Sequence, residues 1–115
     1  MSRADELAAP LLDYQWKNRI ILVNVDKVDL GLKQVERFSV KSEQNEERHL
    51  IVMPVDEKRS EVSRAYAMKP GAFKVVLIGK DGGVKATYSE PVEPDAIYEL
   101  IDSMPMRQDE MKRKK

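Results

Sequence analysis

The chain has 115 residues, 42% of them hydrophobic, and its 20 basic and 20 acidic side chains give a formal net charge of zero. This length fits a single domain, residues 1–115, whose core buries roughly two-thirds of the unfolded surface. The balanced charge argues against a nucleic-acid partner, no apolar run approaches the roughly 18 residues of a membrane span, and the absence of cysteine excludes disulfides, thiolate nucleophiles and cysteine-ligated zinc.

Residues 1–18 are expected to form a lead-in arm. Met1 to Pro10 has no apolar h-region, so no signal peptide is visible. The sequence as it stands therefore indicates a cytoplasmic protein, and an extracytoplasmic one if a leader has been trimmed. Trp16 is the single tryptophan, and we expect the core to cover most of it.

Arg19–Val25 (RIILVNV) is an apolar, β-branched run that predicts a central strand. The chain then leaves this strand, and Asp29 is expected to cap a helix that runs to about Glu47. The inward face of this helix is expected to consist of Leu32, Val35 and Phe38.

A third apolar run, Leu50–Met53, precedes Pro54, which cannot donate to a sheet ladder. This pattern predicts a strand at the edge of the sheet. Asp56–Met68 then predicts a short helix, with Val62, Ala65 and Tyr66 turned inward.

Val75–Ile78 is a continuous apolar run, too short for a helix, that predicts a strand buried on both faces. Lys80–Gly83 (KDGG) favours a tight turn, because Asp-Gly and Gly-Gly tolerate positive φ. Val84–Tyr88 alternates apolar and polar residues, as an edge strand does. The three segments together predict a hairpin.

The last predicted helix begins at Pro94, since proline suits a first helical position. Its apolar stripe consists of Ile97, Leu100, Ile101 and Met104. Pro105 is expected to bend or end the helix at Met104. Residues 107–115 are expected to be a charged tail with frayed helical structure.

The predicted order of elements is βαβαββα. A right-handed crossover makes the first two strands parallel, and the hairpin makes the last two antiparallel. Burial of both apolar runs 20–23 and 75–78 at the centre requires a four-stranded mixed sheet in the order 4-3-1-2, with helices on both faces. This is the α/β layout of thioredoxin-like folds.

Four stretches of the sequence resemble a domain family of unknown function that has been described as peroxiredoxin-like. They are Trp16–Arg19 (WKNR), Glu47-Arg48, Leu77–Lys85 (LIGKDGGVK) and Ile101–Arg107 (IDSMPMR). The family occurs alone in bacteria and within sushi-repeat-containing proteins and a coiled-coil-domain-containing matrix protein. The resemblance covers about Leu11 to Met111 and implies a thioredoxin-like fold without a known reaction.

Thioredoxin-like enzymes carry their reactive thiol just after the first strand, at the start of the first long helix. Here that segment, Asp26–Lys33, has no thiol. Asp26 and Asp29 are candidate binding or acid–base residues there, although Asp29 also suits a helix cap. His49, the single histidine, is expected to be structural, and Gly79–Gly83 is expected to be a turn and not a phosphate loop. We expect no metal centre and no cofactor.

Met104, Met106 and Arg107 form the remaining candidate site. If Pro105 fixes a corner of the chain, Met106 and Arg107 are expected to project from it, and an adaptable thioether beside a guanidinium suits a protein surface that carries a carboxylate. The alternative is that Met104 closes the core and Arg107 pairs within the chain. Lys112–Lys115 is expected to be a solvated tail and not a nucleic-acid site.

These observations favour a cysteine-free thioredoxin-like domain that binds or scaffolds a protein partner and is not an enzyme. One alternative is an enzyme or redox-linked subunit that acts at the exit of the first strand. Another is a homo-oligomeric structural unit that associates through an edge strand.

Overall fold

The computed structural model describes residues 7–113 and contains a four-stranded mixed sheet in the order β2-β1-β3-β4. Strand β1 (Arg19–Asn24) lies at the centre, parallel to β2 (Leu50–Val55) and antiparallel to β3 (Val75–Ile78). Strand β4 (Val84–Tyr88) pairs antiparallel with β3 and forms the far edge. The predicted strand order and the predicted thioredoxin-like layout are confirmed.

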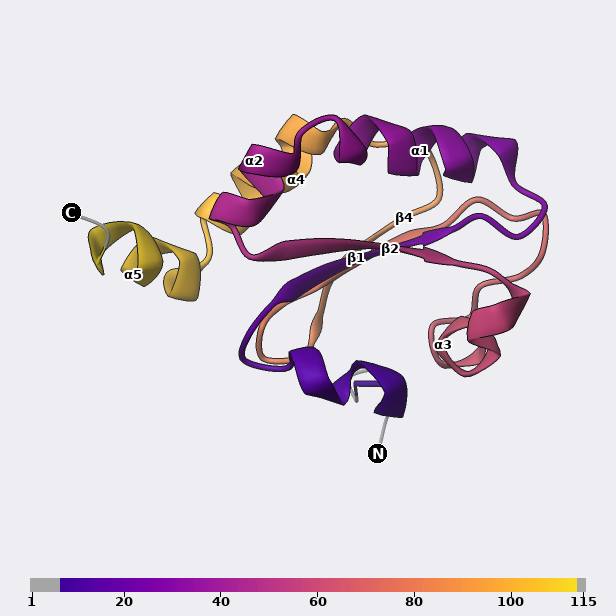
Figure 1. Cartoon of the computed structure of the whole chain (residues 1–115), viewed down its shortest axis with the longest axis horizontal. Coiled ribbons are helices and arrows are strands. Elements are labelled where there is room, and N and C mark those ends of the chain that lie inside the picture. The colour runs from indigo at the N-terminus through magenta and orange to yellow at the C-terminus, as the bar shows by residue number, and fades with distance from the viewer. Residues whose placement is uncertain (1–6, 114–115) are drawn as a thin grey trace.

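Alternate residues of the two central strands point to opposite faces of the sheet, and each face has its own core. Ile20 and Leu22 of β1 belong to one core, whereas Ile21 and Val23 belong to the other. The first core is covered by η1 (Ala9–Tyr14) and by α3 (Ser60–Ala65), which directly follows the short helix η2 (Glu57–Arg59). The second is covered by α1 (Asp29–Ser39), α2 (Ser42–Glu47) and α4 (Pro94–Asp102), which lie above the sheet in Figure 1.

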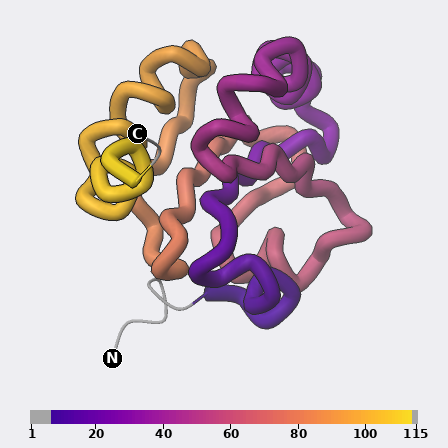
Figure 2. Tube along the Cα trace, turned by 60° about the vertical axis from the view of Figure 1, so that its left-hand side comes forward, coloured from indigo at the N-terminus to yellow at the C-terminus, as the bar shows by residue number. Residues whose placement is uncertain are grey.

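The last helix, α5 (Pro105–Arg113), lies beyond one end of the sheet and covers neither face (Figures 1 and 2). Pro105 does separate two helices as predicted, because α4 ends at Asp102, but it also begins α5, where its missing N–H costs nothing. The prediction of a frayed tail from residue 107 is therefore wrong up to Arg113. Residues 114 and 115, at the end of that tail, lie outside the described residues.

The expected helix from Asp29 to about Glu47 is two helices joined by a turn. Asn45 of α2 folds back and donates its side-chain N–H to the Phe38 carbonyl at the end of α1, at 2.9 Å. The inward face of α1 also differs from the prediction, because Leu32 is 57% exposed. Gln34 is buried instead, since its amide exchanges two hydrogen bonds with the backbone of Val92.

Three smaller expectations are also wrong. Asp29 is the first residue of α1 and not its cap, a position held by Val28 without a side-chain hydrogen bond. Ala65 is exposed, although Val62 and Tyr66 are buried as predicted. Trp16 is 63% exposed, because its backbone takes a φ of 69° and its N–H bonds to the Lys80 carbonyl, which holds the residue at the end of the sheet.

Candidate functional site

Four buried cationic side chains meet at one end of the sheet. Arg19 begins β1, Arg48 comes two residues before β2, and Lys80 comes two residues after β3. Because β1 and β2 are parallel and β3 is antiparallel to β1, these three positions lie at the same end of the sheet. Arg107 joins them from α5. The four residues, here called the cation cluster, are between 1% and 8% exposed.

Three carboxylates are paired with the cation cluster. Glu110 of α5 accepts hydrogen bonds from both terminal nitrogens of Arg19 at 3.2 Å and from Lys80 Nζ at 2.5 Å. Asp102 accepts from Arg48 and from Arg107 at 2.9 to 3.0 Å. Glu47 accepts from Arg107 Nη2 at 2.6 Å. Buried charges are tolerated in this way, with hydrogen-bonded partners.

This pairing shifts the titration of the acidic partners. Burial alone would raise the pKa of Glu110, but hydrogen bonds from Lys80 and Arg19 and the charges of both outweigh it, so that this pKa lies below its ordinary value. Burial alone would also raise the pKa of Asp102. Hydrogen bonds from Arg48 and Arg107 and the charges of both outweigh it, so that the pKa of Asp102 is lowered as well. Both carboxylates are therefore ionised at neutral pH.

His49 belongs to the same group. Its Nδ1 lies 2.7 Å from Lys80 Nζ and 4.0 Å from Glu110 Oε1. Because an ammonium group can only donate, Nδ1 accepts this hydrogen bond and the ring is neutral, with its proton on Nε2. Burial and then the charge of Lys80 lower the pKa of His49, with Glu110 opposing them. The residue has a φ of 51°, a left-handed conformation at the entry to β2.

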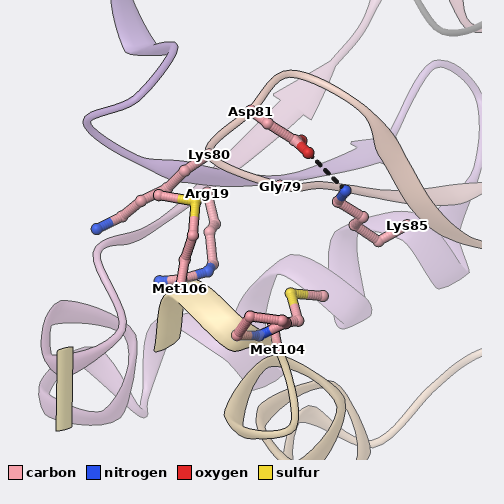
Figure 3. A pocket seen from close by; sticks show the side chains of 8 residues that line it. Arg19, Gly79, Lys80, Asp81, Lys85, Met104 and Met106 are labelled. Atoms are coloured by element: carbon pink, nitrogen blue, oxygen red, sulfur yellow. Dashed lines mark hydrogen bonds and ion pairs between the residues drawn. The ribbon is translucent and has the colours of Figure 1, made fainter. Parts of the chain in front are cut away.

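Two cavities open beside the cation cluster, and Lys80 and Met106 line both of them. The first, here called the Met104 cavity, has a volume of about 320 Å³. Figure 3 shows Met104 and Met106 on one side of it and Gly79, Asp81 and Lys85 on the other. The second, here called the Trp16 cavity, has a volume of about 390 Å³. It is lined by Trp16, His49, Lys80, Met106, Asp109, Glu110 and Arg113.

The structure brings the predicted candidates Met104, Met106 and Arg107 to this end of the sheet, but in different situations. Met104 is half-buried and Met106 is 39% exposed, and both line the Met104 cavity. Arg107 is 1% exposed and paired with Asp102 and Glu47. The expectation that Arg107 projects toward a partner is therefore wrong, and its guanidinium anchors α5 instead.

The other candidates, Asp26 and Asp29, lie at the opposite end of β1. Asp29 is exposed, Asp26 is half-buried, and within residues 7–113 neither carboxylate has an ion pair. The neighbouring backbone is closely packed: a β-carbon on Gly31 would lie 2.0 Å from the Asn24 carbonyl oxygen. Asn24 also donates from its side chain to the carbonyls of Lys69 and Ala72, each at 2.7 Å. The buried polar groups at this exit thus hold the loops together.

Sequence reasoning missed Arg19, Lys80 and Glu110 as parts of one group and treated His49 separately. The sequence did contain a signal. Arg19 and Lys80 each lie next to an apolar run, and the predicted topology places these two residues at the same end of the sheet. In the described part of the chain, no group of three or more histidine and acidic side chains is placed to hold a metal ion. No helix there is long and apolar enough to cross a membrane.

The sheet order, the helices on both faces and the cysteine-free exit of β1 define a thioredoxin-like domain without the usual nucleophile. The chain belongs to the family described as "Domain of unknown function (DUF4174)", whose model matches residues 10–110. Coiled-coil domain-containing protein 80 of Danio rerio is 34% identical over 91 residues, which cover 78% of this chain. The same match covers 10% of that relative, so the chain spans about a tenth of its length.

Solved structures of peroxiredoxins share the fold. The reduced 2-Cys peroxiredoxin of Plasmodium vivax matches with a TM-score of 0.69 and 12% identity, over 86% of this chain and 72% of that one. Thioredoxin peroxidase I of Plasmodium yoelii matches with a TM-score of 0.69 and 14% identity, over 86% of this chain and 79% of that one. At these identities the likeness concerns the fold.

Proposed function

We propose that this domain is a protein-binding module whose contact surface is the end of the sheet around Trp16 and Met106. The observation that carries the proposal is the exposure of Trp16, at 63%, beside Met106, at 39%, on the rim of one cavity. Tryptophan supplies much of the binding energy at protein interfaces, and methionine adapts to the shape of a partner.

Hydrogen bonds and ion pairs fix the segments that form this surface. The backbone N–H of Trp16 donates to the Lys80 carbonyl at 2.6 Å, and Gln15 Nε2 donates to the Asp81 carbonyl at 2.9 Å. These two hydrogen bonds join the residues before β1 to the hairpin turn. Met106 stands on α5, which Glu110 fixes to Arg19 and Lys80. Because the backbone that carries these apolar side chains is held in place before a partner arrives, ordering of the chain adds little to the entropy cost of binding.

The relative from Danio rerio supports a modular role, since the matching segment is about a tenth of a much longer chain. A domain of this kind, without a thiol, suits attachment of one part of an assembly to another. The partner is a protein surface that places an apolar side chain in the Trp16 cavity. Arg107 has no direct part in this contact.

Site-specific photo-crosslinking in cells that naturally contain the chain tests the proposal. We expect p-benzoylphenylalanine at position 106 to form a discrete crosslinked protein species. The matched control carries the same group at Leu32, which is also apolar and 57% exposed but lies on α1. Trp16→Ala should abolish the crosslink from position 106 and leave the melting temperature nearly unchanged. No crosslink from position 106, or the same species from both positions, would contradict the proposal.

A further inference from the structure

The outer edge of β2 presents backbone groups that face no other strand. Strand β2 pairs with β1 on one side only and ends the sheet on the other. The carbonyls of His49 and Val55 accept hydrogen bonds from backbone N–H groups at either end of β1, at 2.8 and 2.9 Å. Because the backbone groups of successive residues alternate between the two sides of a strand, the outward ones belong to Leu50, Val52 and Pro54.

The open part of this edge is short. Pro54 has no N–H, and its carbonyl accepts a hydrogen bond from Arg59 Nε at 3.1 Å, so the far end of the edge is closed. Within residues 7–113, no hydrogen bond reaches the outward N–H and carbonyl groups of Leu50 and Val52. Such unpaired groups on an edge strand are a template for another strand. These two residues supply two donors and two acceptors, and hence allow four hydrogen bonds to an added strand.

A hollow of about 350 Å³ opens beside the same two residues. Leu50 and Val52 line it from the sheet, and their side chains point to the face that α1 and α2 cover. Ile51 lies between them, is half-buried, and points to the opposite face, because side chains alternate along a strand. The rest of the lining is polar and comes from the end of α1 and from α2: Ser39, Ser42, Asn45 and Glu46.

The polar lining of the hollow carries one charge, the carboxylate of Glu46. This side chain is exposed and makes no ion pair within the described residues. The amide of Asn45 and the hydroxyl of Ser39 are already hydrogen-bonded within the domain. A cationic side chain in the hollow would therefore meet an anion, with no cation among the lining residues. An exposed charge pair is weak, so the carboxylate favours one class of segment over another, while the backbone groups supply most of the binding.

We propose that β2 binds an extended segment of a partner protein as a fifth strand, antiparallel to β2 and with alternating basic and apolar side chains. The residues opposite Leu50 and Val52 place basic side chains in the hollow near Glu46, and the residue between them places an apolar side chain against Ile51. Antiparallel pairing brings opposite side chains to the same face and is the more stable arrangement per residue. This inference goes beyond the proposed function, because it concerns the edge of the sheet and not the Trp16 cavity.

Backbone amide NMR of the ¹⁵N-labelled protein tests the inference, with the peptide acetyl-TVKVKVT-amide as the probe. The amide signals of Leu50, Ile51 and Val52 should shift in a saturable way, and the N–H groups of Leu50 and Val52 should exchange more slowly with solvent. The matched control peptide has the same sequence with the backbone nitrogens of both lysines methylated. It keeps the side chains and the charges but lacks the N–H donors opposite Leu50 and Val52, and it should cause no saturable shift.

A change of charge separates the hollow from the backbone pairing. The acidic peptide acetyl-TVEVEVT-amide should bind about fivefold more weakly than the basic one, as expected for an exposed charge pair. Glu46→Lys should reverse this preference. Glu99→Lys, at an exposed position of α4, is the matched control and should leave it unchanged. If Glu46→Lys fails to fold, seen as collapse of the amide spectrum, the three peptides on the native chain decide the question.

Four outcomes would overturn the inference. The absence of a saturable shift at residues 50–52, or equal shifts with the methylated peptide, would show that the edge does not pair with the backbone of the probe. Equal binding of the basic and acidic peptides would show a hollow without charge preference. Shifts of the same amides with protein concentration alone would show that a second copy, and not a partner segment, occupies the edge. None of these outcomes affects the crosslinking test at position 106, so the two proposals fail separately.

Discussion

Glu110 and Arg19 lie 91 positions apart in the sequence, yet both carboxylate oxygens of Glu110 are 3.2 Å from the terminal nitrogens of Arg19. This bidentate pair joins α5 to the first residue of the central strand. Arg107 is the buried residue of α5, and the helix has no apolar stripe of its own. Charge pairing, and not burial of apolar surface, therefore fixes α5 to the domain and gives Met106 its position.

Glu110→Gln should lower the free energy of unfolding by about 3–5 kcal/mol, because Arg19 and Lys80 would stay buried without their anionic partner. Urea denaturation of the variant and the native chain measures this change. Glu99→Gln, at an exposed position of α4, is the control and should change stability by less than about 0.5 kcal/mol. Equal midpoints for Glu110→Gln and the native chain would show that the pair adds nothing to stability.

The titration of His49 should report on the same group. Since His49 is the single histidine, its ring protons give one NMR titration curve, and its pKa should lie below the ordinary 6.5. Lys80→Met should raise this pKa, because it removes a neighbouring positive charge and the donor to Nδ1. Glu110→Gln should lower it further, because Glu110 is the group that raises it. Shifts of the same sign in both variants would contradict this arrangement.

The lowered pKa values of His49 and Glu110 predict how the stability of the protein depends on pH. A group whose pKa is lowered by folding stabilises the native state above its ordinary pKa, and this contribution is lost as the pH falls through the folded value. For His49 the loss begins below pH 6.5, and for Glu110 below pH 4.5. Stability measured between pH 7 and pH 3 should therefore decrease with acid. Glu110→Gln should flatten the part of the curve below pH 4.5.

The sequence identified the sheet because its strands are specified locally. The apolar runs 20–23 and 75–78 are short, β-branched and free of polar residues, and such runs have few alternatives to a central strand. Chirality and the hairpin turn then limited the possible orders of strands. The same logic failed for α5, because its sequence shows no apolar period and its position depends on the distant partners Arg19 and Lys80.

The candidate site was predicted in part for the same reason. Met104 and Met106 could be recognised from their place beside Pro105. For Arg107 the sequence allows two outcomes, projection toward a partner or pairing within the chain, and it does not decide between them, because the burial depends on Asp102 and on Glu47, which is 60 positions away. The break between α1 and α2 is a similar case. The side chain of Asn45 donates to the Phe38 carbonyl and accepts from the Tyr98 hydroxyl, and hydrophobic periodicity does not report such contacts.

The chain should not reduce peroxide with any thiol reductant, because it has no cysteine to form the sulfenic acid on which that reaction depends. A coupled assay of NADPH consumption with thioredoxin, thioredoxin reductase and hydrogen peroxide measures this. A cysteine-containing peroxiredoxin is the positive control. Peroxide turnover by the metal-free protein would contradict this prediction and would support an enzymatic role for the segment that follows β1.

The last prediction concerns the end of α3, where a non-glycine residue has left-handed geometry. Ala67 has a φ of 53°, and the Met68 N–H closes the helix by bonding to the Ser63 carbonyl at 2.8 Å. This is the position after a helix at which glycine is favoured, because a β-carbon crowds the following carbonyl oxygen. Ala67→Gly should therefore raise the free energy of unfolding, by about 1 kcal/mol after the greater entropy of glycine in the unfolded chain is subtracted.

Ala65→Gly, two residues earlier, provides a control of opposite sign. Ala65 is also exposed but lies within α3, where glycine is less favourable than alanine by up to about 1 kcal/mol. Urea denaturation of both variants should give midpoints on either side of that of the native chain. If both substitutions destabilise the protein, the left-handed turn at Ala67 is not strained, and the helix end is held by its hydrogen bonds alone.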